Sequence, residues 1–277
     1  MPNFSQVAVL MAVHSGADVT YLAEALSSLR AQTYSNIRLF VYCDGPLSPE
    51  HENELSRSLD TACGRDLIVR GDLPAGLPTG LNALIARALA DPEISFLARM
   101  DADDISLPER IARQVEFLQQ RPDISLVGTW CIEFTELSVP LFYKRLPTDE
   151  TAVKKFMLYR SPLVHPTVMF RRSVFEEGHR YDVKLTMMQD YELWSRLVIA
   201  GHRISNVPEF LLWFRMANGF FSRRTGWRRA RTEVLMRIHY ARQAGLLRPL
   251  NYLKYVAFFL LRISPVWVKR LSYMHLR

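Results

Sequence analysis

Residues 94–111 read ISFLARMDADDISLPERI, and this stretch decides the fold. It begins with an apolar run, 94–100, that has the length of a buried strand, and it then places three carboxylates within residues 101–104. Like charges this close raise one another's pKa and repel unless a positive charge lies among them. Ser106 and Glu109 then have the spacing of a capping box for a following helix. The stretch predicts a strand, an acidic turn that calls for a cation, and a helix.

The same alternation of strand and helix runs through the first half of the chain. Apolar runs predict strands at residues 7–13, 37–43, 67–69 and 94–100. Helices are expected between them, one capped by Asp18 and another beginning at Thr79, because apolar residues recur there every three or four positions. Such alternation is typical of an α/β fold with a mostly parallel sheet and helices on both of its faces.

Polar residues follow three of these strands at the point where each strand ends. His14 follows the first strand, Asp44 ends the second, and the acidic turn 101–104 follows the fourth. Ligands of such sheets bind beyond the carboxyl ends of the strands. These residues are therefore expected to share one site.

After residue 125 the alternation is less regular. Further strands are expected at 125–134, 166–170 and 210–214, and further helices at 152–159 and 190–199. The last of these helices places Trp194 on its inward face, which favours a core residue over a platform for a sugar. We expect a globular domain over residues 1–220 and a helical extension over residues 221–277.

The extension is strongly basic. Residues 211–277 hold 14 Lys and Arg and a single acid, Glu233, although the whole chain has a net charge of only +7. Basic residues alternate there with Trp, Tyr, Phe and Leu, which is typical of a helix in the interface of an anionic membrane. A helical subdomain packed on the core, with a solvated basic face, explains the pattern as well. Nucleic-acid binding is not expected, because no reading motif accompanies the charge.

Composition excludes several classes of protein. Of the 277 residues, 49% are hydrophobic and 23% charged, which is unlike a disordered or fibrous chain. The three cysteines form no CxxC and are odd in number, which argues against a disulfide framework or a cysteine-based zinc site. Residues 1–13 lack the basic start of a signal peptide, and the apolar run 256–261 is too short to span a membrane. We expect a cytoplasmic protein, peripheral on the cytosolic face of the inner membrane.

The carboxylates suit one chemistry in particular. Asp101 and Asp103 are two residues apart at a strand end, so a turn there can aim both at one point. Mg²⁺ and Mn²⁺ take oxygen ligands, and Mg²⁺ typically keeps one or two protein carboxylates while substrate phosphates fill other positions. The pattern indicates a metal that enters with a nucleotide diphosphate. The competing interpretation is that these acids are turn formers and a helix cap.

Four segments occur in order along the chain, namely VAVLMAVHSG (7–16), VYCDGP (41–46), FLARMDADDISLPERIARQVEFL (96–118) and MMQDYELWSRLVIAGH (187–202). Their order and spacing resemble family 2 glycosyltransferases over residues 6–215. HPTVMFRRSVF (165–175) resembles the subset that builds bacterial capsular, exopolysaccharide or lipopolysaccharide chains. The resemblance implies the Rossmann-like GT-A fold and inverting transfer of a sugar from a nucleotide diphosphate donor, with Mn²⁺ or Mg²⁺ as cofactor. It favours a UDP-sugar donor and a growing cell-surface glycan or lipid-linked acceptor.

The resemblance also implies roles for individual residues. Ala12 and His14 lie where the family's backbone meets the nucleotide base, and Asp44 matches the acid that recognises uracil. Asp101 matches the residue near the ribose and the metal, and Asp103 matches the direct metal ligand.

A second group of implied roles concerns the acceptor. Asp190 matches the general base, and a helix N-terminus there would hold it ionised, although a helix cap explains an Asp at this place equally well. Many relatives have an acid immediately before this residue, where this chain has Gln189, which hydrogen-bonds but brings no charge. Glu192 is the second candidate for the base.

Three further residues are candidates with two interpretations each. Arg99 lies two residues before Asp101 on the same strand face, so it pairs either with these acids or with a donor phosphate. Asn82 contacts the nucleotide or is a surface residue. His165 contacts the acceptor or the metal, or it is a structural histidine.

Two other functions remain open. A metal-dependent nucleotidyltransferase shares a nucleotide site and metal-binding acids, but it usually has a Gly-rich triphosphate loop where this chain has only residues 14–16. A non-catalytic membrane-bound scaffold of the same fold would lack donor turnover. A nicotinamide dehydrogenase is not expected, because no G-x-G-x-x-G follows a strand.

Overall fold

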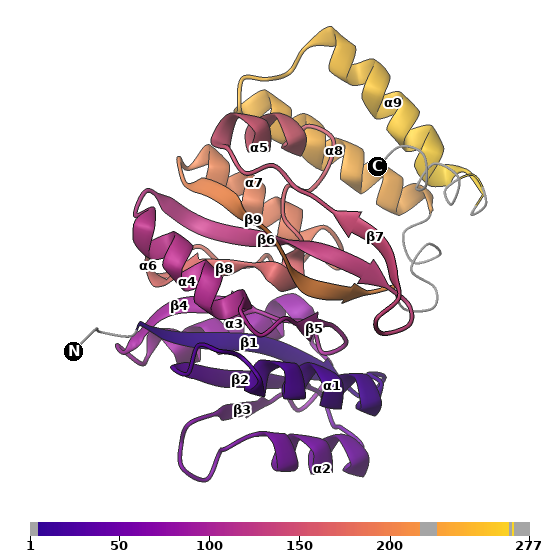
Figure 1. The fold of residues 1–277 in the computed structure, drawn as a ribbon. Helices are drawn as coiled ribbons and strands as arrows, with labels where there is room; N and C mark the ends of the chain where they lie inside the picture. The colour runs from indigo at the N-terminus through magenta and orange to yellow at the C-terminus, as the bar shows by residue number, and fades with distance from the viewer. Residues whose placement is uncertain (1–4, 217–225, 266–267, 269–277) are drawn as a thin grey trace.

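The computed structural model describes residues 5–216, 226–265 and 268, and a single sheet runs through its centre (Figure 1). The strand order is β3-β2-β1-β4-β8-β6-β9-β5, with β7 paired to β6. The strands are β1 (Gln6–His14), β2 (Ile37–Asp44), β3 (Leu67–Arg70), β4 (Ile94–Arg99), β5 (Ile105–Ser106), β6 (Ile124–Phe134), β7 (Pro140–Lys144), β8 (Met169–Arg171) and β9 (Arg203–Arg215). The helices are α1 (Val19–Arg30), α2 (Pro49–Ser58), α3 (Leu77–Leu89), α4 (Arg110–Gln120), α5 (Glu150–Met157), η1 (His165–Thr167, a 3₁₀ turn), α6 (Arg172–Glu176), α7 (Gln189–Ile199), α8 (Trp227–Gln243) and α9 (Pro249–Ile263).

The first half of the sheet is parallel and sets the position of the site. β3, β2, β1 and β4 run in the same direction, with His14 opposite Asp44 and Leu10 opposite Arg99. The carboxyl ends of β1, β2 and β4 therefore meet at one edge, as the sequence predicts. In the second half, β8 runs antiparallel to β4 and to β6, and β9 runs parallel to β6.

Helices cover both faces of the sheet, which confirms the predicted α/β class. On β1 the side chains alternate, so Val9 packs in a core with α1, α2 and α4, while Leu10 packs in a second core with α3, α6 and α7. Both residues are almost completely buried, as expected for a strand covered on two sides.

Two local predictions are wrong. Ser106 does not cap a helix, because it pairs with β9 as part of β5 and its hydroxyl accepts a hydrogen bond from Gln32 Nε2 (3.0 Å). Helix α4 begins at Arg110 without a side-chain cap. The strand expected at 166–170 is shorter, because Pro166 lacks an N–H for the sheet and lies in the turn η1.

Strand β9 begins seven residues before the predicted strand 210–214. Its first part carries Ser205 and Asn206, which are polar and therefore broke the apolar pattern. Both are nonetheless buried, and their side chains donate hydrogen bonds to backbone carbonyls, Ser205 to Thr148 (2.5 Å) and Asn206 to Pro147 (2.8 Å). These bonds satisfy the donor groups of both side chains inside the protein, which lowers the cost of burying them.

The C-terminal helices α8 and α9 pack on the α/β unit. Tyr240 of α8 is fully buried and donates a hydrogen bond to the carbonyl of Lys154 (3.1 Å), and Asn251 of α9 donates to the hydroxyl of Tyr159 (2.7 Å). These contacts agree with the interpretation of a packed helical subdomain. The predicted boundary at residue 220 lies outside the described residues. Among the described helices, none combines the length and the apolar character that crossing a membrane requires.

Candidate active site

Three carboxylates converge in the turn that follows β4. Ligand oxygens of Asp101, Asp103 and Asp104 all lie within 4.8 Å of one another. Asp104 is almost completely buried, and its Oδ1 accepts the backbone N–H of Arg215 at 2.7 Å. Its Oδ2 is buried and has no hydrogen-bond partner among the described residues. The turn therefore presents a compact, oxygen-rich cluster of the three carboxylates that the sequence places there.

Three arginine side chains lie next to this cluster. Arg99 forms an ion pair with Asp101, and its side chain is only 4% exposed. The Nε and Nη1 atoms of Arg99 are buried without a hydrogen-bond partner in the described part of the chain. Arg215 donates from Nε to the carbonyl of Asp103 (2.7 Å), and Arg110 donates to the carbonyls of Pro166 (2.7 Å) and Arg99 (3.3 Å). Unused N–H groups of a buried arginine beside a carboxylate cluster suit an anionic ligand such as a phosphate.

The electrostatics of the cluster favour a cation. Burial raises the pKa of Asp103 to about 6, with a further contribution from the charge of Asp101, while Arg99 and Arg215 act in the opposite direction. Burial also raises the pKa of Asp104 well above its ordinary value, and Asp101 and Asp103 add to this effect. Carboxylates that repel one another in this way gain most from a divalent ion. Their oxygen ligands fit Mn²⁺ or Mg²⁺.

Asp190 lies in the first turn of α7. The N-cap of this helix is Met188, in the left-handed region with φ 59°, so Asp190 is not the cap. Within the described residues no hydrogen bond to the Asp190 carboxylate is found. Burial raises the pKa of Tyr181, Arg99 lowers it, and Asp190 and Asp101 raise it further. Tyr181 thus lies within electrostatic range of both Asp190 and Asp101.

Tyr181 is held in place by two of the predicted site residues. The His165 Nε2 and the Tyr181 hydroxyl are 2.9 Å apart. Asn82 donates from Nδ2 to the Tyr181 carbonyl (2.8 Å) and accepts the Tyr181 N–H at Oδ1 (3.0 Å). Burial lowers the pKa of His165 well below its usual range, and Arg99 adds to the effect, so this imidazole is neutral. In this structure Asn82 and His165 position Tyr181, and Trp194 packs against His165 as a fully buried core residue.

The three residues predicted to meet the nucleotide base lie along the same edge of the sheet. The Asp44 carboxylate accepts backbone N–H groups from Ala75 (2.6 Å) and Gly76 (3.1 Å), which fixes the loop before α3. His14 is exposed at the end of β1, and Ala12 is half-buried two residues earlier. All three predicted nucleotide contacts are therefore brought to the edge where the carboxylates lie.

Glu192, the second candidate for the base, already forms an ion pair with Arg196. Its carboxylate accepts two hydrogen bonds from Arg196 one turn later on α7, from Nε (2.5 Å) and from Nη2 (2.9 Å). Gln189 is half-buried at the first position of α7. Of the two acids near the start of α7, Asp190 is the one without an ion pair in the described residues.

The sequence signal for Tyr181, Arg215 and Asp104 was weak. Tyr181 belongs to no motif, and Arg215 is one of several arginines in a basic region. Asp104 was visible as the third acid of the turn, but its burial depends on a hydrogen bond from a residue 111 positions away. Spacing within the turn contains no information about that bond.

Comparison with known proteins identifies the fold and the family of this chain. The structure is similar to the mannosyltransferase PcManGT of Pyrobaculum calidifontis in complex with GDP-Man and Mn²⁺, with a TM-score of 0.62, 14% identity, and coverage of 97% of this chain and 79% of that one. The fold is thus the GT-A fold of glycosyltransferases. The family described as glycosyl transferase family 2 matches residues 9–178, and the chain belongs to that family.

Two relatives match nearly the whole chain. One is the amylovoran biosynthesis glycosyltransferase AmsE of Erwinia amylovora, which is 31% identical over 270 residues, covering 96% of this chain and 97% of the relative. The other is the UDP-Gal:alpha-D-GlcNAc-diphosphoundecaprenol beta-1,3-galactosyltransferase of Escherichia coli, which is 24% identical over 271 residues, covering 98% and 92%. The protein is a glycosyltransferase.

Proposed function

We propose that this glycosyltransferase moves a sugar from a nucleotide diphosphate donor to a hydroxyl of a bacterial surface glycan or its lipid-linked precursor, with inversion at the anomeric carbon. The observation that carries the proposal is the carboxylate cluster of Asp101, Asp103 and Asp104 next to the unpartnered guanidinium nitrogens of Arg99. A metal ion would supply the positive charge that the three carboxylates need. A diphosphate would supply the negative charge and the hydrogen-bond acceptors that Arg99 needs.

We propose a UDP-sugar as the donor. The name of the relative from Escherichia coli gives UDP-Gal as donor and a diphosphoundecaprenol-linked sugar as acceptor, and the relative from Erwinia amylovora acts in amylovoran biosynthesis. Asp44 lies at the end of β2 on the edge that would meet the base. Its carboxylate already orders the loop at Ala75 and Gly76, which gives the base a fixed surface.

The leaving group is the diphosphate of the nucleotide. Asp101 and Asp103 would hold Mn²⁺ or Mg²⁺, and a bound ion neutralises negative charge that develops on the diphosphate as the glycosidic bond breaks. The guanidinium of Arg99 would donate hydrogen bonds to the diphosphate. Because Arg99 is buried away from water, this interaction would be stronger than in solution. Asp104 and Arg215 keep the turn in place, because one backbone N–H and one side chain of β9 are bonded to it.

The acceptor hydroxyl loses its proton to Asp190. The oxygen of that hydroxyl attacks the anomeric carbon from the side opposite the diphosphate, the carbon–oxygen bond to the diphosphate breaks, and the proton moves to a carboxylate oxygen of Asp190. A general base in such a position contributes roughly 10²–10⁴-fold to the rate. Single in-line displacement inverts the anomeric centre.

Calorimetry with a panel of nucleotide sugars tests the proposal. We expect one UDP-sugar to bind in the presence of Mn²⁺ and to lose its binding when EDTA is added or when Asp103 is replaced by Ala. Asp123→Asn is the matched control, because this acid pairs with Arg121 and Arg203 on the surface and should bind donor as the native chain does. Absence of binding by every nucleotide sugar, with or without metal, would favour the scaffold. Binding of nucleoside triphosphates alone would favour the nucleotidyltransferase.

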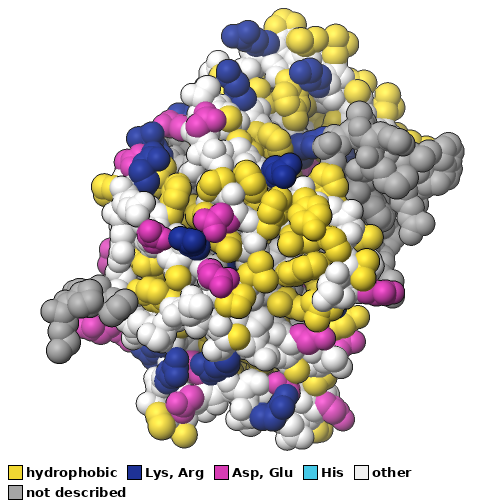
Figure 2. Space-filling model, viewed as in Figure 1, with side chains coloured by type: hydrophobic (Ala, Val, Ile, Leu, Met, Phe, Trp, Pro, Cys, Tyr) yellow, Lys and Arg dark blue, Asp and Glu magenta, His cyan; other side chains and the backbone are white. Residues whose placement is uncertain are grey.

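Helix α9 is proposed as the contact with an anionic membrane. Its exposed large hydrophobic residues are Leu250 (61%), Tyr252 (48%), Leu253 (69%), Val256 (58%), Leu260 (56%) and Ile263 (43%), and Lys254 is exposed among them. Its inward side carries Asn251 and Tyr255, both buried. Hydrophobic side chains with Lys and Arg among them cover the top of the molecule in Figure 2, where Figure 1 places α9. An apolar stripe bordered by basic residues is complementary to an anionic lipid interface, where a lipid-linked acceptor resides.

The double variant Leu253→Glu/Leu260→Glu is expected to bind anionic vesicles at least about tenfold more weakly, because two leucines no longer transfer from water into the interface. Co-sedimentation with phosphatidylglycerol-containing vesicles measures the effect. The control is Leu141→Glu, an equally exposed leucine (56%) on β7. Equal binding by the double variant and the native chain would disprove the membrane role of α9, provided that donor binding shows both to be folded.

A further inference from the structure

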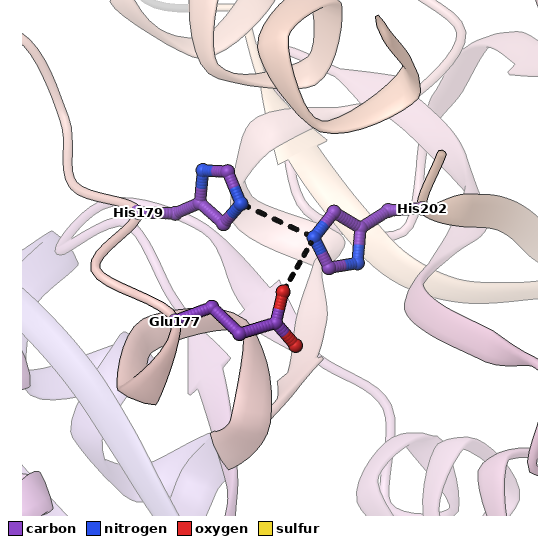
Figure 3. Close-up of side chains that lie close together, drawn as sticks. All are labelled: Glu177, His179 and His202. Atoms are coloured by element: carbon purple, nitrogen blue, oxygen red, sulfur yellow. Dashed lines mark hydrogen bonds and ion pairs between the residues drawn. The ribbon is translucent and has the colours of Figure 1, made fainter. Parts of the chain in front are cut away.

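Two histidines and a glutamate converge outside the active site (Figure 3). Glu177 and His179 follow α6, and His202 follows the end of α7. His179 Nε2 and His202 Nε2 are 3.2 Å apart, and His202 Nε2 lies 3.1 Å from Glu177 Oε2. All three ligand-capable atoms lie within 4.8 Å of one another.

We propose that Glu177, His179 and His202 form a zinc site that braces the segment leading to Asp190. Two imidazole nitrogens and one carboxylate are a usual protein ligand set for Zn²⁺, with water in the fourth position. Tetrahedral zinc with bonds of about 2.0–2.2 Å holds its ligand atoms roughly 3.3 Å apart. The two separations in this cluster, 3.2 Å between the Nε2 atoms and 3.1 Å from His202 Nε2 to Glu177 Oε2, are close to that spacing.

The hydrogen bonds around the cluster prepare its nitrogens for a metal. His202 Nδ1 lies 3.0 Å from the hydroxyl of Ser125 on β6, so a proton on Nδ1 leaves the lone pair of Nε2 free for coordination. The carbonyl of His179 accepts a hydrogen bond from Arg180 Nη1 (2.7 Å), which fixes the backbone at that ligand. Such support from groups behind the ligands is typical of zinc sites.

The charges beside the cluster also suit a metal. The positive charge of Arg196 is compensated by its ion pair with Glu192, so the carboxylate of Glu177 remains available to offset the charge of an ion.

The site connects elements that are separate in the sequence. A metal there would tie the turn after α6 to the turn after α7, with Ser125 of β6 behind it. Tyr181 follows His179 by two residues, and Asp190 lies at the opposite end of α7 from His202. Both ends of the chain between Glu177 and His202, which includes Tyr181 and Asp190, would then be anchored. We assign the metal a structural role and no part in sugar transfer.

Zinc titration of the chelator-stripped full chain, in competition with a chromophoric chelator, tests the site. The native chain is expected to bind one equivalent of Zn²⁺ that His179→Gln and His202→Gln both lose. Co²⁺ bound in its place should give the intense visible absorption of four-coordinate cobalt, and these variants should lack it. His239→Gln is the matched control, because His239 is exposed on α8. Any zinc bound by the acidic turn at Asp103 stays the same in all of these proteins, so only the difference counts.

Thermal unfolding gives a second readout. Saturating Zn²⁺ is expected to raise the Tm of the native chain and of His239→Gln by roughly 5 °C more than it raises the Tm of His179→Gln. Glu177→Gln changes an exposed residue, so it should have little effect on folding. It should weaken the affinity for Zn²⁺ at least about tenfold. The same number of zinc equivalents, bound with the same affinity, in the native chain and in all three ligand variants would overturn the proposal. Neither readout depends on glycosyl transfer.

Discussion

Replacing Asp103 by Asn is expected to abolish metal-dependent turnover while it stabilises the metal-free protein. The loss of a charged oxygen ligand should lower kcat/KM by roughly 10³-fold or more, because the charge on the leaving diphosphate is no longer neutralised in place. The gain in stability follows from burial, which raises the pKa of Asp103 to about 6 from its ordinary value of 3.8.

The sign of the stability effect follows from proton binding. Between pH 3.8 and 6 the folded protein holds a proton on Asp103 that the unfolded chain has released, so stability falls as the pH rises through this window. Above pH 6 the full cost of the buried charge, of order 1–3 kcal/mol, is present, and Asn removes it. Urea unfolding in EDTA should therefore show a more stable Asp103→Asn variant at pH 7 and a smaller difference at pH 4.

Two comparisons make this test decisive. Asp123→Asn, which removes an exposed acid in surface ion pairs, should leave turnover unchanged and should not stabilise the metal-free chain at pH 7. Added Mn²⁺ should stabilise the native chain and leave Asp103→Asn unaffected, since binding to the folded state alone raises stability. If Asp103→Asn keeps its turnover, the acidic turn does not hold a catalytic metal. If the variant is less stable than the native chain in EDTA at pH 7, burial of the Asp103 charge does not destabilise the metal-free protein.

Replacing Asp190 by Asn is expected to lower kcat by about 10²–10⁴-fold with little change in KM or in donor binding. Asn keeps the size and the hydrogen-bonding ability of the side chain but cannot take the proton of the acceptor. Steady-state kinetics with a defined acceptor measure the split between kcat and KM. Donor calorimetry shows whether the donor site is intact.

Glu192→Gln is the matched variant on the same helix. Because Glu192 is already paired with Arg196, its loss should change kcat by less than about threefold. The reverse pattern, with Glu192→Gln inactive and Asp190→Asn active, would assign the base to Glu192. A variant of Asp190 that loses donor binding as well as kcat would place this residue in the donor site.

The sequence predicted the parts of the site that are local in the chain. The strand ending before Asp101, the spacing of Asp101 and Asp103, and the position of Asp190 at the start of a helix all depend on neighbouring residues, whose pattern is readable. Placement of these residues on one edge of the sheet follows from parallel strands, which alternation with helices predicts. For this reason the fold and the acidic turn could be predicted from the sequence.

What the sequence did not predict depends on distant contacts. The role of Asn82 in holding Tyr181 involves a partner 99 residues away, and His179 and His202, the histidines of the proposed zinc site, are 23 residues apart without a known metal spacing. Such pairs are set by how α3, α6 and α7 pack, and no periodicity along the chain reports on packing between elements. The apolar outer side of α9 had a sequence signal, but which side faces outward depends on contacts such as that of Asn251 with Tyr159.

The bond between Asp104 and Arg215 also sets an order for assembly during synthesis. Asp104 leaves the ribosome more than a hundred residues before its partner, so the nascent chain carries the acidic turn without the N–H group and the guanidinium that later hold it. Strand β9 also lies between β6 and β5, so the sheet cannot close until β9 has been made. The parallel half of the sheet can collapse early around β1, β2 and β4, but the acidic turn reaches its final form only when residue 215 has been made. An interruption of translation before that point leaves a partial sheet with an unfinished acidic turn.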